Sequence, residues 1–419
     1  MGTRAWGGLV LLLMGVLGAN IGLAADWSLV PSLNSKTEYN SNINTTPTGH
    51  LSDFIFTLNP SAALNYATEA TKLQGTLGIS QLLYVKNTGF NHTDQNYQIN
   101  GQYSLAPRFN VSLNSSFISD STSQQEFLAS GMIITRTPRL SFAVSPGVNY
   151  ALTERSTAIL SYYFNRVIYQ PFPNTQVQPF PNTQTQNLQN YSTQLVSLVY
   201  QYLLSEKTTL FDTVSATESN YTGITNNYKS LLFSLGVQHN YSANWVFNLA
   251  GGLNYSLYAS SSQIASFGQF PNFVLVPTQT QKTTNLSPYF NLGATRRWTN
   301  LSITGGFSRN QQPSGFGFIA QVNALSLNAS YNFTERLIGT LGGGYSLSSE
   351  SSNTGQNQTN SFNFGSQLTY QITERLTASS GYTFTNQNYG GNNLSSTSSS
   401  HVHNVLLMFN YSYPIHHQK

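Results

Sequence analysis

The sequence predicts an all-β fold, an antiparallel β-barrel of about eighteen strands that spans a membrane. Three observations carry this prediction. Apolar and polar residues alternate with a period of two along most of the chain, as in strands whose two faces meet different surroundings. Only 8% of the residues are Asp, Glu, Lys or Arg, against roughly 25% in soluble globular proteins. A Thr-Glu-Arg core recurs in ALTERS, NFTERL and QITERL, at residues 151–156, 332–337 and 371–376.

The N-terminal segment, residues 1–25, differs from the rest of the chain. Arg4 precedes an apolar run over residues 9–23, and small residues follow. This order is typical of a cleaved secretory signal peptide, with cleavage after Ala24 or Ala25; a membrane anchor is the alternative, although the apolar run is short for a span. We therefore expect residues 26–419 to form the barrel.

Composition excludes several classes of protein. The chain has no cysteine, which excludes thiol catalysis and thiolate metal sites. A net charge of +4 over 419 residues gives no sign of a nucleic-acid partner. After Leu23 no stretch approaches the roughly 20 apolar residues of a transmembrane helix.

The polar face of the predicted strands is uncharged. In SFNFGSQLTYQI, residues 361–372, Phe362, Phe364 and Leu368 share one face while Asn363 and Gln367 share the other. A soluble sandwich or solenoid, the alternative, normally carries Lys and Glu on its polar faces. Asn, Ser, Thr, Gln and Gly instead favour an enclosed, hydrated lumen with lipid on the opposite face.

The connections between strands are alternately short and long, which gives the count of about eighteen strands. Short turns are predicted near Glu69, Arg108, Glu154, Glu206, Ala243, Thr299, Glu335 and Glu374, and longer loops at about 41–50, 87–94, 121–134, 171–187, 221–227, 260–282, 310–316, 350–358 and 389–400. An even count with short periplasmic turns and long external loops is typical of the bacterial outer membrane.

The Glu-Arg pairs mark these short turns. An exposed pair contributes only about 0–1 kcal/mol as an attraction, whereas an Arg on the lipid face at mid-membrane costs about 2–4 kcal/mol. The pairs therefore fix the depth of each hairpin. A girdle of aromatic residues is expected a few residues from the turns, at Tyr66, Tyr150, Tyr202, Tyr241, Trp245, Trp298, Tyr331 and Tyr370.

The alternation of inward and outward residues along each predicted strand places a small set of charged residues inside the barrel. These candidate pore-lining residues are Lys36, Glu38, Asp53, Lys86 and Arg139. Pores that select ions by sign need an array of fixed charge, and the later strands line this face mainly with Asn, Ser, Thr, Gln and Gly. The lumen is therefore suited to uncharged or weakly charged polar solutes such as carbohydrates; plain hydration of the interior is the alternative for any single residue.

Proline-rich repeats occupy two of the predicted long loops. The segment QPFPNTQVQPFPNTQTQ, residues 170–186, contains a tandem octad, and residues 269–281 echo it. Such proline density stiffens the backbone. Loops that fold over the mouth would present Phe172, Phe180 and Phe270 to sugar rings; a variable surface loop grown by duplication is the alternative that the sequence favours.

No catalytic or metal site is predicted. The seven histidines lie far in sequence from a convincing acid and nucleophile set. His401 with His403, and His416 with His417, lack a recognisable third ligand. We expect a non-enzymatic protein without a cofactor or metal.

The segments WSLVPSLNSKTEYNSNI, residues 27–43, and SDFIFTLNPSAALNY, residues 52–66, resemble the outer-membrane β-barrel proteins found with bacterial exopolysaccharide and PEP-CTERM/exosortase systems. Ser41 and Asn42 stand where an acidic residue is common in that family. The resemblance implies an outer-membrane location and a part in polysaccharide export, without functional residues to carry over. We thus expect a passive, porin-like channel for polar solutes or exopolysaccharide. The alternative is a barrel sleeve for a periplasmic or export-complex partner, such as a porin-cytochrome conduit.

Overall fold

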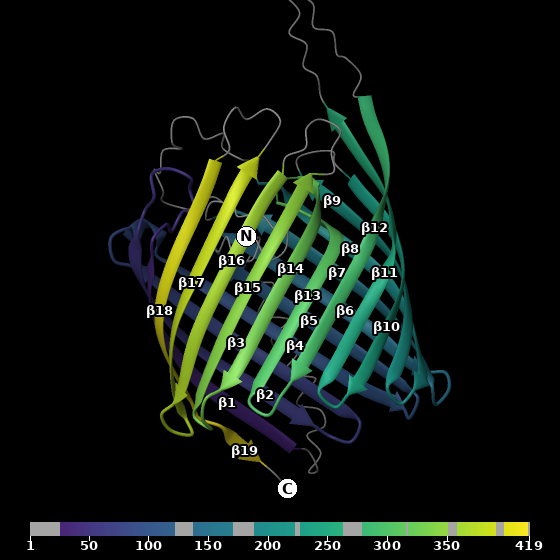
Figure 1. Ribbon diagram of the computed structural model, residues 1–419, viewed down its shortest axis with the longest axis horizontal. Helices are drawn as coiled ribbons and strands as arrows, with labels where there is room; N and C mark the ends of the chain where they lie inside the picture. Colours follow the sequence, from purple (N-terminus) through teal and green to yellow (C-terminus); the bar gives the residue numbers. More distant parts are fainter. Residues whose placement is uncertain are drawn as a thin grey trace, which may run out of the picture.

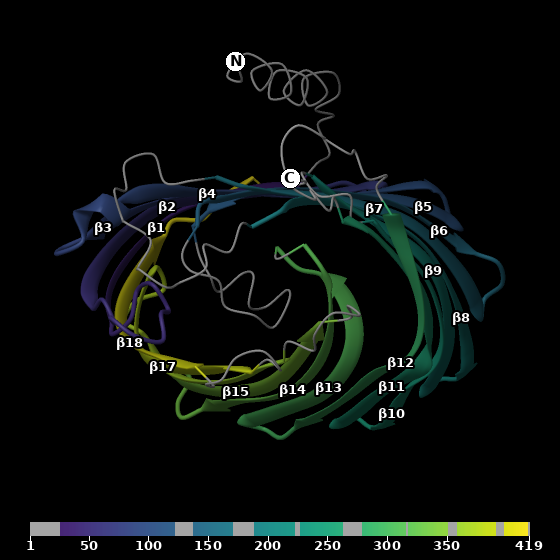
Figure 2. The ribbon, with the colours of Figure 1, turned by 90° about the horizontal axis from the view of Figure 1, so that it is seen from above.

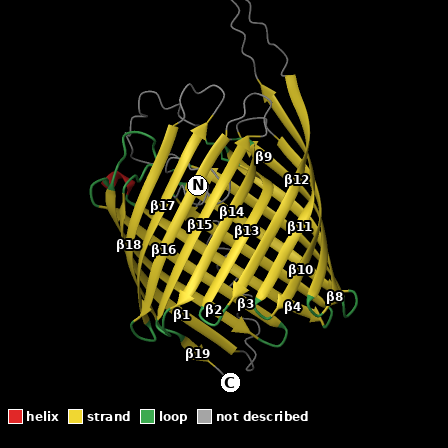
Figure 3. Ribbon diagram, viewed as in Figure 1, coloured by secondary structure: helices red, strands yellow, loops and turns green. Residues whose placement is uncertain are grey.

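The computed structural model describes residues 26–121, 137–170, 188–222, 227–262, 279–315, 317–350, 358–390 and 398–417. The predicted signal peptide, residues 1–25, lies outside this part of the chain and stays a prediction. Strands account for nearly all of the described residues, with one short 3-10 helix, η1 (Thr88–Phe90) (Figure 3).

The strands follow one another along the chain and are joined as hairpins (Figure 1). Their bounds are β1 (Asp26–Asn40), β2 (Asp53–Ala67), β3 (Thr71–Tyr84), β4 (His92–Ala106), β5 (Phe109–Asp120), β6 (Arg139–Ala151), β7 (Ser156–Tyr169), β8 (Asn190–Ser205), β9 (Thr208–Thr222), β10 (Asn227–Ser242), β11 (Trp245–Ser262), β12 (Gln279–Arg297), β13 (Leu301–Pro313), β14 (Ile319–Asn332), β15 (Leu337–Glu350), β16 (Gln358–Gln371), β17 (Leu376–Gly390), β18 (Ser398–Ser412) and β19 (Ile415–His417).

The sheet closes on itself. Each strand from β1 to β18 pairs antiparallel with its neighbours in sequence, and β1 also pairs with β18, from Ser32↔Ser412 to Asn40↔Asn404. The short β19 continues β18 beyond Pro414 and pairs with β1 at Trp27–Leu29. Figure 2 shows the resulting ring from above. The predicted antiparallel barrel of eighteen wall strands is confirmed.

The short turns have a local cause beyond the Glu-Arg pair. In the turn at 371–376 the hydroxyl of Thr373 accepts hydrogen bonds from the backbone N–H groups of Arg375, over 3.2 Å, and Leu376, over 3.0 Å. Thr334 and Thr153 accept from the backbone in the same way. The threonine thus satisfies amides that the tight turn removes from the ladder, while the charged pair stays in water.

The outer surface of the barrel is apolar. On β10, Leu231, Phe233 and Leu235 alternate with the less exposed Leu232 and Ser234. The other wall strands except β13 and β17 also carry an exposed Leu, Ile, Val, Phe or Tyr, and on β13 and β17 the corresponding apolar residues are half-buried. No helix among the described residues is long and apolar enough to cross a membrane. A continuous apolar exterior around a closed sheet is the surface that lipid requires.

Aromatic rings and arginines meet at the short-turn end. The guanidinium carbon of Arg296 lies 4.2 Å from the ring centre of Trp298 and 4.9 Å from that of Trp245. The guanidinium of Arg375 lies 4.2 Å from the ring of Tyr413. These cation–π contacts place the charge and the rings together at the membrane surface, as expected for an interfacial girdle.

Candidate functional site: the barrel lumen

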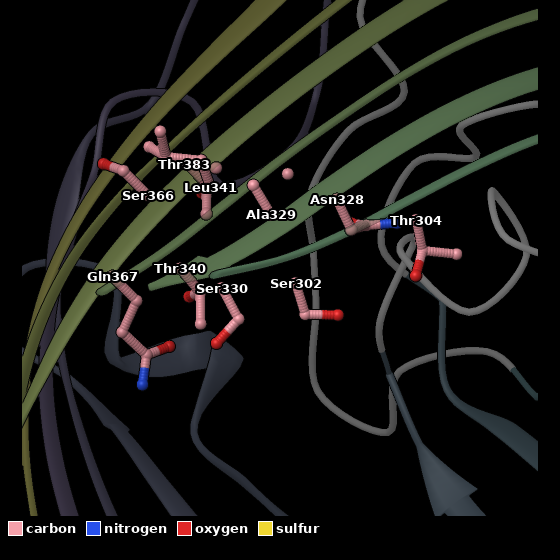
Figure 4. Close-up of a pocket in the computed structure, with 12 residues that line it drawn as sticks. Ser302, Thr304, Asn328, Ala329, Ser330, Thr340, Leu341, Ser366, Gln367 and Thr383 are labelled. Carbon is pink, nitrogen blue, oxygen red and sulfur yellow. The ribbon is translucent and has the colours of Figure 1, made fainter. Parts of the chain in front are cut away.

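The part of the inner wall of β13–β17 that lies nearer the short turns is lined mainly by neutral, hydrogen-bonding residues. A recess of about 440 Å³ lies against this wall (Figure 4). Its lining residues are Ser302, Thr304, Asn328, Ala329, Ser330, Thr340, Leu341, Gly342, Gly365, Ser366, Gln367 and Thr383. None of the described residues that line the recess carries a charge, so a solute here meets mainly hydroxyl and amide groups.

Many of the inner hydroxyl groups are paired between strands. Thr295 and Thr304 lie 3.1 Å apart, oxygen to oxygen, and Thr369 and Ser379 lie 3.0 Å apart. Each hydroxyl retains a second hydrogen-bonding site after such a contact. The wall can therefore exchange hydrogen bonds with water or a solute without a net charge.

The predicted inner charges are mostly neutralised locally. Lys36 and Glu38 lie two residues apart on the inner face of β1, and Nζ of Lys36 donates to Oε2 of Glu38 over 2.7 Å. Both charges cancel within one strand, so the pair gives the lumen little net field.

Asp53 has a structural role at the long-loop end. Its side chain is only 1% exposed, and its carboxylate accepts from the backbone N–H groups of Lys86 and Asn87 and from the Asn87 amide. Asp53 thus fixes the connection that follows β3. Lys86, also predicted to line the pore, lies in this connection with an exposed side chain.

Arg139 forms a buried ion pair across the ends of β5 and β6. Its Nε donates to Oδ1 of Asp120 over 3.1 Å and its Nη2 to Oδ2 over 2.9 Å, in a bidentate arrangement. Arg139 and Asp53 therefore stabilise the mouth of the barrel from within, and the structure does not bring the five predicted charges together.

One histidine lies closer to a hydroxyl and an acid than the sequence suggested. Nε2 of His92 is 2.6 Å from Oγ of Ser121 and 3.2 Å from Oδ1 of Asp94. The Ser121 side chain is 1% exposed, so a substrate cannot reach this hydroxyl. The contacts join the start of β4 to the end of β5. In the described part of the chain no group of three metal-ligating side chains is found.

The largest feature that the sequence prediction missed is an inward-folded hairpin. The tip of the β13–β14 hairpin leaves the wall and reaches into the ring (Figure 2). Gln311 of β13 contacts three residues of the inner wall: it accepts from Tyr228 over 2.8 Å and from Asn254 over 3.2 Å, and donates to Ser287 over 3.0 Å. The hairpin narrows the long-loop half of the lumen.

Aromatic residues on the inner wall hold the hairpin tip. Ile319 packs in a buried cluster with Val167, Tyr191, Tyr221 and Tyr228. The Tyr221 hydroxyl donates to the backbone carbonyl of Phe318 over 2.7 Å. At the tip Gly317 has a φ of 83°, a left-handed conformation that glycine adopts without steric cost.

A second inward element follows β1. Ile43 packs with Ile55, Leu82, Tyr84 and Phe90 in a buried cluster on the inner side of β2 and β3. The three loop candidates predicted from the sequence, Phe172, Phe180 and Phe270, lie outside the described residues.

Comparisons with known proteins give similar barrels at low sequence identity. No family model and no curated protein matches the chain. A solved structure of Acinetobacter baumannii OccAB4 has a TM-score of 0.45 and 10% identity, covering 95% of this chain and 100% of that one. Pseudomonas aeruginosa OccK2 (OpdF), in complex with glucuronate, has a TM-score of 0.46 and 10% identity over 94% and 98%. The unliganded ferric citrate transporter FecA has a TM-score of 0.48 and 7% identity over 94% and 79%.

The closed ring, the apolar exterior and the unequal connections at its two ends define the location of the chain. The protein is a bacterial outer-membrane barrel. In barrels of this kind the short turns usually face the periplasm and the long loops the outside, which is the orientation expected from the sequence.

Proposed function

We propose that the protein is a non-enzymatic, passive channel for small, uncharged or weakly charged polar solutes, with carbohydrates as the best-fitting class. The observation that carries the proposal is the neutral inner wall of β13–β17 around the recess. A hydroxyl-rich wall replaces the hydration of a sugar hydroxyl at little cost, whereas it gives no preference to either sign of ion.

The inner charges support the same conclusion. Lys36 with Glu38, and Arg139 with Asp120, form ion pairs, so each of these two positive groups has its own negative neighbour. The pore-lining role of Lys36, Glu38, Asp53, Lys86 and Arg139 remains a proposal, with Lys86 the residue most able to reach a passing solute because its side chain is exposed.

The test is a comparison of ions with sugars. In planar bilayers the purified protein is expected to give steady conductance steps with a permeability ratio of potassium to chloride near 1, and in proteoliposomes to admit neutral sugars faster than sugar acids of the same size. A strong preference for one sign of ion, or no conductance at all, would contradict the proposal.

A substitution inside the recess sharpens this test. Thr340→Asp adds a single fixed charge to the neutral wall and is expected to turn the channel toward cations. The control Thr340→Asn places an uncharged residue of similar size at the same position, so it should leave the ion preference unchanged.

Export of an exopolysaccharide is a more specific form of the same proposal. The resemblance of residues 27–66 to barrels of exopolysaccharide systems supports it, and a neutral hydroxyl-lined wall fits a sugar chain. The competing proposal, a sleeve around a periplasmic partner, predicts that the protein co-purifies with that partner and conducts poorly alone. Conductance of the isolated barrel therefore separates the two.

A further inference from the structure

Strand pairing in the barrel wall ends early at one seam. β12 pairs with β11 along its whole length, but with β13 only from Arg297↔Ser302 to Phe290↔Arg309. Beyond Phe290, residues 284–289 of β12 have β11 on one side and no described strand on the other. Pro288, which lacks a backbone N–H, lies in this part of the strand, as is typical of an edge.

The other side of the seam has moved inward. On the outward face of β13, Leu301, Ile303 and Phe307 are followed by Arg309 and Gln311. The change from apolar to polar occurs where β13 leaves β12, because beyond this point the face contacts the polar inner wall and no longer lipid. The bond from Gln311 to Ser287 shows that the hairpin lies behind β12 and not beside it.

The open edge lies at membrane depth. Leu286 is 61% exposed and Pro288 is exposed, and they pair with Tyr255 and Leu253 of the apolar exterior. An open strand edge is not tolerated in contact with hydrocarbon alone. The edge at 284–289 therefore needs water or polar groups on its lumen side, while its outward side chains present an apolar surface at the depth of the outer leaflet.

A cationic group stands at the fork where the strands separate. Arg309 is the last residue of β13 that pairs with β12. With the Gln321 amide turned so that its oxygen accepts, the Arg309 guanidinium donates to that oxygen through Nη2 and, over 3.1 Å, through Nε. Within the described residues Arg309 forms no ion pair, and its neighbours on the outward face include Phe290 and Phe307.

We propose that the β12–β13 fork is a lateral binding site for a single-chain anionic amphiphile. The carboxylate head lies at the Arg309 guanidinium, which retains donors beyond those used by Gln321. The tail lies along Leu286 and Pro288, at the depth of the outer leaflet. The site joins the lumen to the membrane from the side, and it does not depend on which solute passes along the barrel axis.

Binding of a spin-labelled twelve-carbon carboxylate to the purified barrel in nanodiscs tests the head-group contact. Arg309→Gln is expected to weaken binding about tenfold, since one charge-assisted contact is lost, and Arg309→Lys should restore part of it. The matched control is Arg166→Gln, because Arg166 lies on the outward face of β7, where both neighbouring strands stay paired. The control should bind as wild type does. The proposal would be overturned if Arg309→Gln weakened the binding of the carboxylate and of the corresponding neutral alcohol by the same factor.

A second variant tests the place of the tail. The chain has no cysteine, so Pro288→Cys gives a single thiol at the seam that a bulky maleimide can block. Blocking is expected to abolish carboxylate binding and leave ion conductance unchanged. The control is Leu198→Cys, an exposed outward residue of β8 away from the seam, and its modification should leave binding intact. The proposed site is refuted if blocking the thiol abolishes carboxylate binding in both variants or in neither of them. The ion conductance of the same samples tests the proposed channel independently of this site.

Discussion

The buried pair of Asp120 and Arg139 allows a quantitative test of how the mouth of the barrel is stabilised. Each side chain is 9% exposed, and two hydrogen bonds of 3.1 and 2.9 Å join them. At an effective dielectric constant of about 20, unit charges about 3 Å apart attract by roughly 6 kcal/mol, and desolvation offsets part of this. Removing one partner is therefore expected to lower the free energy of unfolding by about 3–5 kcal/mol.

The assay is urea unfolding of the barrel in phospholipid vesicles, followed by tryptophan fluorescence. Arg139→Met should show the full loss, because Asp120 is left buried without its partner. The double variant Asp120→Val with Arg139→Met should recover most of it, because no lone charge remains. A loss below about 1 kcal/mol in the single variant, or an equal loss in single and double variants, would refute this account of the pair.

Three further predictions concern the wall, the hairpin and the girdle. Leu327 lies on the lipid-facing side and is 59% exposed, so Leu327→Arg should lower the free energy of unfolding by up to about 2–4 kcal/mol in the same assay. Asn328 lines the recess, so Asn328→Arg should leave the free energy of unfolding nearly unchanged and make the channel favour anions in bilayer recordings. Equal stabilities of the two variants would contradict the assigned faces. Gln311→Ala removes three hydrogen bonds that hold the hairpin inside the lumen, so single-channel steps should become larger or less uniform, and unchanged steps would show that the hairpin does not limit flow. Arg296→Ala removes two cation–π contacts and should lower the unfolding free energy by about 1 kcal/mol; Arg297→Ala, its neighbour, serves as the control and should cost less.

The sequence was sufficient to predict the closed barrel, and the reason is physical. A strand between lipid and water must alternate with period two, and a turn outside the membrane can carry the charge that the strands exclude. The alternation along a strand and the charges at a turn each involve only neighbouring residues, so both can be recognised in the sequence. The turns predicted at Glu335 and Glu374 lie at these positions in the structure. The prediction for residues 260–282 was less accurate, because β11 and β12 extend into the predicted loop, to Ser262 and from Gln279.

The lumen was predicted less completely because its contacts are not local. The alternation along each strand could not show that Lys36 pairs with Glu38, that Asp53 caps a neighbouring connection or that Arg139 binds Asp120. Two features of the sequence indicate the inward hairpin, although the alternation along a single strand does not reveal it. The apolar face of β13 turns polar at Arg309, and Pro288 interrupts the hydrogen-bonding capacity of β12.

The contact between β1 and β18 has a consequence for how the molecule is made. Ser32 of β1 pairs with Ser412 of β18. The strand β1 therefore cannot form this pairing until almost the whole polypeptide has reached the membrane. Until then β1 exposes a row of unpaired amides, which is the kind of edge that recruits other chains. The ring must therefore be completed in its last step, and a chain shortened before residue 398 should accumulate as an open, aggregation-prone sheet.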